Sequence, residues 1–305
     1  MRILVTGSSG WLGQTLVPRL RDLGHEVVGI DPVAAPTTTI VGSIVDRRLV
    51  ESTIGDHGIE AIVHAGALHK PHVALETRER FIAVNVQGTL NLLEAAVAPG
   101  APVARFVFTS TTSLMISRAM YDGAGDGQGR AAWVTEDLAP LVPRNIYGVS
   151  KLAAEHLCRL FHEQHGLPLI VLRTARFFPE ADDMAHRIEQ SDENTKTNEL
   201  LFRRLTVEDA AESHVVALDR APEIGFDTFI VAAPTPFLPE DCADLLRDAP
   251  SVVARRVPQY RELYDRLGWT MFRTIDRVYD AGRIARRLGF VARTDFAARL
   301  RQLAR

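Results

Sequence analysis

The chain has 305 residues and a formal net charge of −3 at pH 7, so it can bury a full core as one large α/β domain or as a domain with a smaller appendage. A charge this close to neutral gives no reason to expect nucleic acid or an anionic membrane as a partner. The first predicted strand begins at Arg2 and no apolar run approaches ~18 residues, which leaves no room for a signal peptide or a membrane-spanning helix, so we expect a soluble, cytoplasmic protein.

The first predicted elements are a strand, a glycine turn and a helix within MRILVTGSSGWLG. Gly7 permits the sharp turn after the strand, Gly10 lets the backbone approach a diphosphate, and Gly13 lets the helix pack closely against the sheet. The helix, predicted over 11–23, presents a stripe of leucines, and the free N–H groups at its start can face phosphates. Three glycines alone could form a plain turn, but this context favours a nucleotide site.

A second strand, predicted over 25–30, ends at Asp31. A carboxylate at this place accepts hydrogen bonds from the adenosine ribose and repels a 2′-phosphate. The spacing therefore predicts NAD rather than NADP as the cofactor, with an ordinary loop aspartate as the alternative.

Strands and helices alternate with short gaps through the first 175 residues, which is typical of a parallel sheet covered by helices on both faces. Within the stretch 110–144, the segment DGAGDGQGR is glycine-rich and polar, and we expect this segment to be mobile. The other elements predicted in this part are strands at 38–41, 59–64, 103–109 and 167–173, and helices from Asp46, over 78–98 and over 145–165.

Beyond Arg173 the pattern changes, because 178–198 is rich in acids and lacks apolar periodicity. That stretch predicts a loop, either over a ligand or simply solvated. Thr206 is expected to cap a helix, and later elements are predicted as a strand at 226–232 and helices at 239–247, 275–288 and 294–303.

The predicted fold is therefore α/β, a Rossmann-like doubly wound parallel sheet with a smaller, mostly helical C-terminal substrate portion. We place the NAD-binding domain at residues 1–178, with the strand near 226–232 returning to it, and the substrate-binding portion at 179–305.

Tyr147 and Lys151 stand four residues apart on one predicted helix, so both side chains leave the same face. An ammonium beside a phenol favours the phenolate and lowers the tyrosine pKa, which suits a general acid or base. A surface pair is the alternative reading of this short motif. The run FVFTSTT places hydroxyls at the carboxyl edge of the sheet, where open α/β sheets bind ligands, and Asn85 lies mid-helix, where asparagine is disfavoured unless it is exposed or has a role.

No metal site is predicted. His64, His69 and His72 cluster after one strand but lack a second ligand motif, so they read as a solvated loop. Cys158 and Cys242 form neither a disulfide framework nor a zinc pattern, and we treat both as structural.

Six motifs in order, TGSSGWLG, IVHAGA, NVQGTLNLLEAA, FVFTSTT, YGVSK and VLRTARFFPE, resemble the extended short-chain dehydrogenase/reductases, in particular the NAD-dependent sugar epimerase/dehydratase group. The resemblance covers about residues 1–180. It implies that Thr111 orients the substrate, Tyr147 is the acid/base, Lys151 holds the nicotinamide ribose and Asn85 supports the site. The predicted cofactor contacts are Gly7, Ser9, Gly10, Trp11, Leu12, Gly13, Asp31, Ser43, Ile44, His64, Ala65, Gly66, Thr109, Tyr147 and Lys151.

Three departures from the family pattern bear on ligand contacts. Gly42-Ser43-Ile44 replaces Gly-Asp-Ile/Leu near the adenine, and Leu114-Met115-Ile116 replaces Val-Tyr-Gly near the substrate. Arg176 stands where UDP-sugar epimerases have an asparagine. An arginine in the pocket needs an anion, so we expect an acidic substrate, with surface arginines as the alternative. The predicted substrate-binding residues are Thr111, Thr112, Arg176, Arg203 and Arg204.

The leading functional hypothesis is an NAD-dependent epimerase/dehydratase that transfers a hydride from a sugar or nucleotide-sugar to NAD. When the hydride returns to the same molecule, the net reaction is epimerisation or dehydration. The first alternative is an NAD-dependent dehydrogenase of a sugar or uronic acid that releases NADH. The second is a non-catalytic NAD-sensing regulator, which usually lacks the tyrosine or the lysine that this chain retains. We expect a small-molecule partner, an anionic sugar or nucleotide-sugar, and a homodimer.

Overall fold

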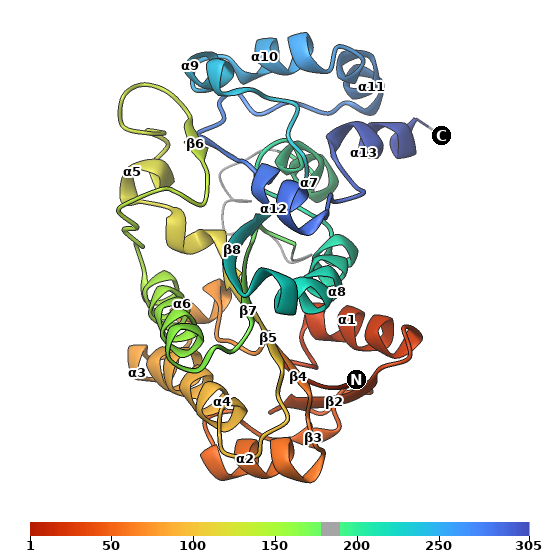
Figure 1. The fold of residues 1–305 in the computed structure, drawn as a ribbon. Helices are drawn as coiled ribbons and strands as arrows, with labels where there is room; N and C mark the ends of the chain where they lie inside the picture. The colour runs from red at the N-terminus through yellow and green to blue at the C-terminus, as the bar shows by residue number, and fades with distance from the viewer. Residues whose placement is uncertain (178–189, 305) are drawn as a thin grey trace. The chain divides into compact units, whose positions relative to one another are not determined.

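The computed structural model describes residues 1–177 and 190–304, and the chain packs as two units (Figure 1). Each unit is assembled from three segments. The first comprises Met1–Leu114, Val142–Thr174 and Ala210–Phe229; the second comprises Met115–Leu141, Ala175–Asp209 and Ile230–Arg305. Residues 115–141 thus pack with the second unit, whereas the sequence placed them in the first domain.

The first unit contains most of a seven-stranded sheet in the order β3-β2-β1-β4-β5-β7-β8. The pairs from β3 to β7 are parallel, and β8 follows the same direction because Leu169 N–H donates to Gly225 O at 2.7 Å and Ala175 N–H to Val231 O at 2.8 Å. The strands are β1 Arg2–Thr6, β2 Glu26–Asp31, β3 Ile40–Val41, β4 Ala61–His64, β5 Arg105–Thr111, β7 Leu169–Thr174 and β8 Phe226–Val231. The predicted doubly wound α/β fold is confirmed.

Helices cover both faces of this sheet: α2, α4 and α6 lie on one side in Figure 1, and α1 and α8 lie on the other. An ion pair between Arg19 and Glu212 at 2.9 Å joins α1 to α8. The regular elements are α1 Trp11–Asp22, α2 Arg47–Asp56, the 3₁₀ turn η1 Lys70–Ala74, α3 Arg78–Ile82, the π turn η2 Ala83–Gln87, α4 Gly88–Ala96, the 3₁₀ turn η3 Thr112–Met115, α6 Ile146–His165 and α8 Val207–Ile224.

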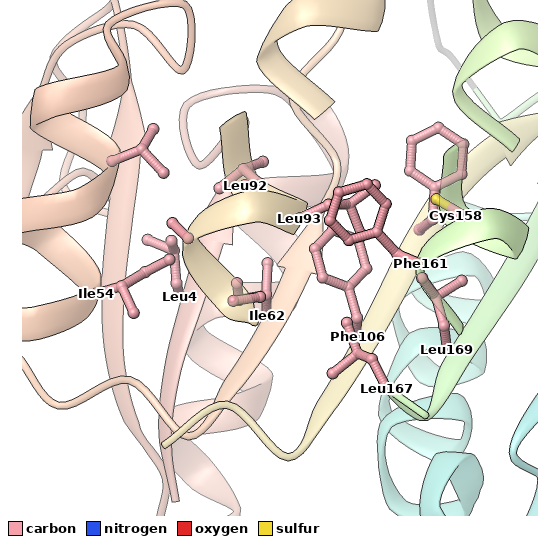
Figure 2. Packing of buried hydrophobic residues seen from close by; sticks show 14 of the residues in the cluster. Leu4, Ile54, Ile62, Leu92, Leu93, Phe106, Cys158, Phe161, Leu167 and Leu169 are labelled. Carbon is pink, nitrogen blue, oxygen red and sulfur yellow. The ribbon is translucent and has the colours of Figure 1, made fainter. Parts of the chain in front are cut away.

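The core of this unit forms because alternate strand residues point to the same face of the sheet. Figure 2 shows Leu4, Ile62, Phe106 and Leu169 from neighbouring strands packed against apolar side chains of α2, α4 and α6, including Leu92. Burial of so many full side chains, each worth about 1.5–3 kcal/mol, fixes the strand ends that carry the site.

The second unit is mostly helical and packs around a separate apolar core that includes Phe237, Leu245, Val253 and Phe296. Its two short strands form a parallel pair. The elements are α5 Arg118–Tyr121, β6 Ala132–Val134, α7 Asp192–Glu199, the 3₁₀ turn η5 Pro239–Asp241, α9 Cys242–Leu245, α10 Ala249–Arg256, α11 Tyr260–Leu267, β9 Arg277–Tyr279, α12 Gly282–Leu288 and α13 Phe296–Leu303.

Several predictions for this unit are wrong. A helix over 275–288 is replaced by β9 followed by α12, and β6 follows the glycine-rich segment, where no strand was predicted. Three residues are too few to show strand alternation, and these two strands pair only with each other. Helix α7 overlaps the predicted loop 178–198. The sequence did not predict this helix because its buried face is polar rather than apolar. Residues 178–189 of the predicted loop lie outside the described residues.

Candidate active site

In the glycine turn after β1, the backbone packs directly against other backbone segments. Gly7 has φ +71°, and a Cβ there would lie 2.7 Å from Gly66 N; a Cβ on Gly13 would lie 2.6 Å from Ser8 Cα. Both glycines are therefore required by the packing of the chain itself. Among the described residues, a Cβ on Gly10 would meet only Gly7 O, at 3.3 Å, so these residues leave the space in front of Gly10 open.

Helix α1 begins beside that space without a side-chain cap. Its N-cap is Gly10, and its first turn contains no acidic residue. The unsatisfied N–H groups and the positive end of the helix dipole form a favourable place for a diphosphate. Trp11 is about half exposed here, whereas Leu12 is buried against the sheet. These features fit a dinucleotide.

Asp31 lies at the end of β2 and reaches the same turn. Its Oδ2 accepts a hydrogen bond from Ser9 N–H at 3.3 Å, and its Oδ1 accepts one from Val33 N–H at 2.8 Å. The Ser9 hydroxyl lies 2.7 Å from that of Thr38. The structure thus brings together Asp31, Ser9 and the glycine turn, as an acidic ribose contact requires.

Ser43 and Ile44 follow β3 and are held by α4. Ile44 is buried against Gly88, where a Cβ would lie 2.6 Å from Ile44 Cγ1, and Ile44 O accepts a hydrogen bond from Asn91 Nδ2 at 2.9 Å. Ser43 Oγ accepts from Val45 N–H at 3.2 Å. Contact of this segment with adenine stays a prediction.

Tyr147 and Lys151 lie on one buried face of α6. Asn145 begins the helix, since its side chain accepts from Gly148 N–H at 2.9 Å, and Gly166 ends it in a left-handed conformation. The side chain of Thr111, the last residue of β5, interacts with the Tyr147 phenol and acts to lower its pKa. The predicted Thr111–Tyr147 pair is therefore close together.

The electrostatics of this pair bear on the expectation that Lys151 lowers the pKa of the phenol. Burial raises the pKa of Tyr147 to about 12, and the opposing influence is the side chain of Thr111. The Lys151 Nζ lies 3.9 Å from the centre of the Phe108 ring, and burial lowers the pKa of this ammonium to about 7. Desolvation dominates both groups in the chain alone, so stabilisation of the phenolate by Lys151 stays a prediction.

Three residues predicted to contact ligands have hydrogen-bond partners within the protein, and their ligand contacts stay predictions. Thr109 Oγ1 lies 2.8 Å from His214 Nε2, and Thr112 Oγ1 donates to Thr174 O at 3.4 Å. His64 is buried, with both ring nitrogens engaged by threonine hydroxyls. The following residues do lie beside the glycine turn: Ala65 N–H donates to Thr6 O at 3.3 Å and Gly66 N–H to Thr6 Oγ1 at 2.9 Å.

Asn85 is in the interior, so the exposed alternative is excluded. Its Oδ1 accepts from Leu68 N–H at 2.8 Å, and its Nδ2 donates to Leu68 O at 2.8 Å and to Ser150 Oγ at 2.9 Å. The Ser150 hydroxyl in turn donates to Tyr147 O at 2.9 Å. Asn85 thus supports the helix turn that carries the tyrosine.

Sequence reasoning missed a buried ion pair one turn beyond Lys151. Glu155 accepts from Arg173 Nε at 3.0 Å and Nη2 at 2.7 Å, and from the Ser110 hydroxyl at 2.6 Å. A signal was available, because Glu155 stands four residues after Lys151 and so shares its buried face.

The three predicted substrate arginines lie together in the second unit around Glu199, at the end of α7. Arg204 Nε lies 2.7 Å from this carboxylate, Arg203 Nη2 lies 2.8 Å from it, and Arg176 Nε lies 4.0 Å from it. Glu199 is fully buried. The structure brings the three arginines together, and it shows that a carboxylate of the chain also binds them.

The described part of the chain contains neither a cluster of metal-binding side chains nor a membrane-spanning helix. Within 1–177 and 190–304, no three side chains of His, Cys, Asp or Glu gather closely enough to hold a metal ion. No helix in this part of the chain has the length and apolar character needed to cross a membrane.

Comparison with known proteins gives a consistent result. The sequence profile described as "NAD dependent epimerase/dehydratase family" matches residues 3–225. The low-salt glycan biosynthesis protein Agl12 of Haloferax volcanii is 32% identical over 193 residues, which are 58% of this chain and 57% of that protein. The UDP-glucose 4-epimerase of Azospirillum brasilense is 32% identical over 183 residues, 56% of this chain and 48% of that protein. The chain spans about half the length of these curated relatives.

A solved structure extends the similarity over the whole chain. A short-chain dehydrogenase/reductase superfamily protein from Agrobacterium tumefaciens, with bound NAD, has a TM-score of 0.69 and 26% identity, and the match covers 100% of this chain and 96% of that chain.

Proposed function

Because the chain belongs to the NAD-dependent epimerase/dehydratase family, we propose that it binds NAD and acts on a sugar or nucleotide-sugar by epimerisation or dehydration. The observation that carries this proposal is the buried face of α6, on which Tyr147 lies close to the Thr111 hydroxyl and Lys151 follows one turn along. A positioned phenol is a proton carrier, and a neighbouring hydroxyl can orient the substrate oxygen.

The uncapped start of α1, the open space at Gly10 and the carboxylate of Asp31 fit the diphosphate and ribose of NAD. We propose that the first two receive the diphosphate and that Asp31 accepts from the adenosine ribose. When bound, NAD supplies a ring that accepts a hydride and can return it.

In this proposal Tyr147 moves the proton of the sugar hydroxyl. Its pKa of about 12 keeps it protonated at neutral pH, ready to donate to a carbonyl oxygen. To accept a proton, the Tyr147 phenol needs a lower pKa. Lys151 lies one turn away and has a pKa of about 7, and its charged form would lower the pKa of the phenol. A homodimer and an anionic substrate stay predictions.

The test is incubation of the purified chain with NAD and a panel of UDP-, GDP- and dTDP-sugars and free uronic acids. Product stereochemistry and NADH absorbance are followed together. A product with an inverted centre or one water fewer, without net NADH, is expected. Stoichiometric NADH would instead identify a dehydrogenase, and NAD binding without turnover of any compound would favour the regulator.

A further inference from the structure

A continuous chain of buried hydrogen bonds runs through the first unit from the end of β1 to helix α6. Its side chains are Thr6, His64, Thr89, Asn85 and Ser150, each no more than 1% exposed. The successive distances are 2.7 Å from Thr6 Oγ1 to His64 Nδ1, 2.9 Å from His64 Nε2 to Thr89 Oγ1, 2.7 Å from Thr89 Oγ1 to Asn85 O, 2.9 Å from Asn85 Nδ2 to Ser150 Oγ and 2.9 Å from Ser150 Oγ to Tyr147 O.

The direction of each hydrogen bond around His64 follows from its neighbours. A carbonyl oxygen only accepts, so the Thr89 hydroxyl donates to Asn85 O and must accept from His64 Nε2–H. In the neutral ring Nδ1 is then an acceptor and receives the Thr6 hydroxyl, whose oxygen accepts from Gly66 N–H at 2.9 Å. One tautomer of neutral His64 satisfies every donor and acceptor in this part of the chain.

The surroundings of His64 favour that neutral form. The ring lies against two aromatic side chains, with centroids 6.2 Å from Phe106 and 5.4 Å from Phe108. Burial holds the pKa of His64 well below its usual value, and the charge of Lys151 lowers it further. A protonated ring would also carry a hydrogen on Nδ1, so the Thr6 hydroxyl could no longer donate to this nitrogen.

The helix around Asn85 is irregular at the point where this chain reaches it. In the π turn η2, Gly88 N–H donates to Ala83 O, five residues earlier. Such turns are rare and often occur at functional sites. The Thr89 hydroxyl binds the backbone carbonyl of Asn85 within this turn, while the Asn85 side chain binds both backbone groups of Leu68 and the Ser150 hydroxyl.

We propose that His64 and Thr89 are positioning residues for Tyr147: they fix Asn85 within the π turn, and Asn85 fixes the first turn of α6 through Ser150. The inference rests on the proposed function for its catalytic consequence, but the hydrogen-bond chain can be tested separately. His64 was expected to contact the cofactor directly; in this proposal it acts from beneath the site, by joining the end of β1 to the helix that holds Asn85.

The test compares Thr89→Val with Thr89→Ser in the full chain. Valine keeps the size of threonine and removes the hydroxyl, which leaves Asn85 O and His64 Nε2–H without this partner, whereas serine retains both hydrogen bonds. We expect kcat to fall by roughly 10- to 100-fold in Thr89→Val, since small misplacements of reacting groups have effects of this size, with the NAD dissociation constant changed less than about twofold. Thr89→Ser should stay within about threefold of the parent.

Amide hydrogen exchange provides a readout that needs no substrate. Leu68 N–H is bound by Asn85, so its exchange should accelerate at least about tenfold in Thr89→Val while amides of β1 and β5 keep their protection. Equal acceleration throughout the sheet, or none at Leu68, would overturn the positioning role. If Thr89→Val does not fold, Thr6→Val against Thr6→Ser tests the other end of the chain by the same exchange measurement.

The tautomer of His64 gives a second measurement, on the unmodified protein. Ring ¹⁵N shifts should report hydrogen on Nε2 alone at pH 7. Hydrogen on Nδ1 would contradict the assigned order of donors. If the parent shows this tautomer and Thr89→Val shows the faster Leu68 exchange, but the parent transforms no sugar, the proposed function is overturned and the hydrogen-bond chain stands.

Discussion

Two buried carboxylates, one in each unit, meet arginine in different ways. In the first unit, both Glu155 oxygens are bound by the single guanidinium of Arg173, in a one-to-one pair. In the second unit, three guanidinium groups lie within 4.0 Å of Glu199. The first arrangement balances charge and clamps α6 to β7, and the Ser110 hydroxyl adds β5. The second gathers cations around one anion.

The difference separates structural charge from charge that can serve recognition. In the first unit the ionised pair holds α6 to the sheet, and the neutral side chain of Thr111 interacts with the Tyr147 phenol. Of the three arginines around Glu199, Arg176 has the longest separation from the carboxylate, 4.0 Å against 2.8 and 2.7 Å. Changes in the first unit should therefore alter kcat, stability or NAD affinity, and a change at Arg176 should alter KM.

The largest effect is expected from Tyr147→Phe. This change keeps the ring and removes the proton carrier, so kcat should fall by roughly 10²–10⁴-fold while NAD still binds. Turnover on the identified substrate and NAD binding by calorimetry are measured side by side. A phenylalanine variant with near-parental kcat would remove Tyr147 from the chemistry.

Breaking the one-to-one ion pair should have the next largest effect. Arg173→Met leaves Glu155 buried without its guanidinium, which costs about 3–5 kcal/mol in the free energy of unfolding. The double variant Glu155→Leu/Arg173→Met removes both charges and should recover most of this loss. Urea denaturation of the parent and the variants gives the comparison; equal losses in the single and double variants would contradict it.

Acid should weaken the first unit through His214. Burial lowers the pKa of this histidine from 6.5 to about 4. Between these values the unfolded chain binds a proton that the folded chain does not, so the free energy of unfolding rises with pH from about 4 to 6.5 and is lost as pH falls. The contribution is roughly 3 kcal/mol at ~1.4 kcal/mol per pKa unit. His214→Gln should flatten the pH dependence of urea denaturation by about one proton, and an unchanged slope would refute this.

Local signals explain which parts of the first unit could be predicted from sequence. The glycine turn, Asp31 after its strand, and the helix ends at Asn145 and Gly166 are all encoded within a few residues. The role of His64 was not, since its partners Thr6 and Thr89 lie 58 and 25 residues away. Only folding supplies such contacts.

Helix α7 shows why the second unit was harder to predict. Its buried Asn194 and Asn198 have no apolar periodicity, and both donate to Thr270 O, at 3.0 and 2.8 Å. The Tyr264 hydroxyl binds Asn198 Oδ1 at 2.7 Å. Polar side chains on a buried helix face require partners that are more than 60 residues distant here, so no local pattern marks them.

A change at Asp31 should alter the preference for NAD over NADP, with a smaller effect than the changes described above. Asp31→Ala combined with Pro32→Arg removes the ribose acceptor and adds a phosphate partner, so NAD should bind roughly 10- to 100-fold more weakly and NADP should be admitted. Asp31→Asn is the control, because it keeps an acceptor oxygen for the turn and loses the charge. Calorimetry with both dinucleotides measures the change; equal NAD affinity in parent and double variant would exclude Asp31 from the site.

The smallest expected effect, and the one that tests the contrast between the two carboxylates directly, is that of Arg176→Leu. If Arg176 binds an anionic substrate, the loss of one charge-assisted hydrogen bond should raise KM about tenfold and leave NAD affinity unchanged. Arg176→Lys keeps the positive charge but loses the planar guanidinium, so its KM should lie between those of the parent and Arg176→Leu. Should the substrate be uncharged, or should Arg176→Leu lower stability and leave KM unchanged, then Arg176 serves Glu199, and Glu155 and Glu199 are both structural carboxylates.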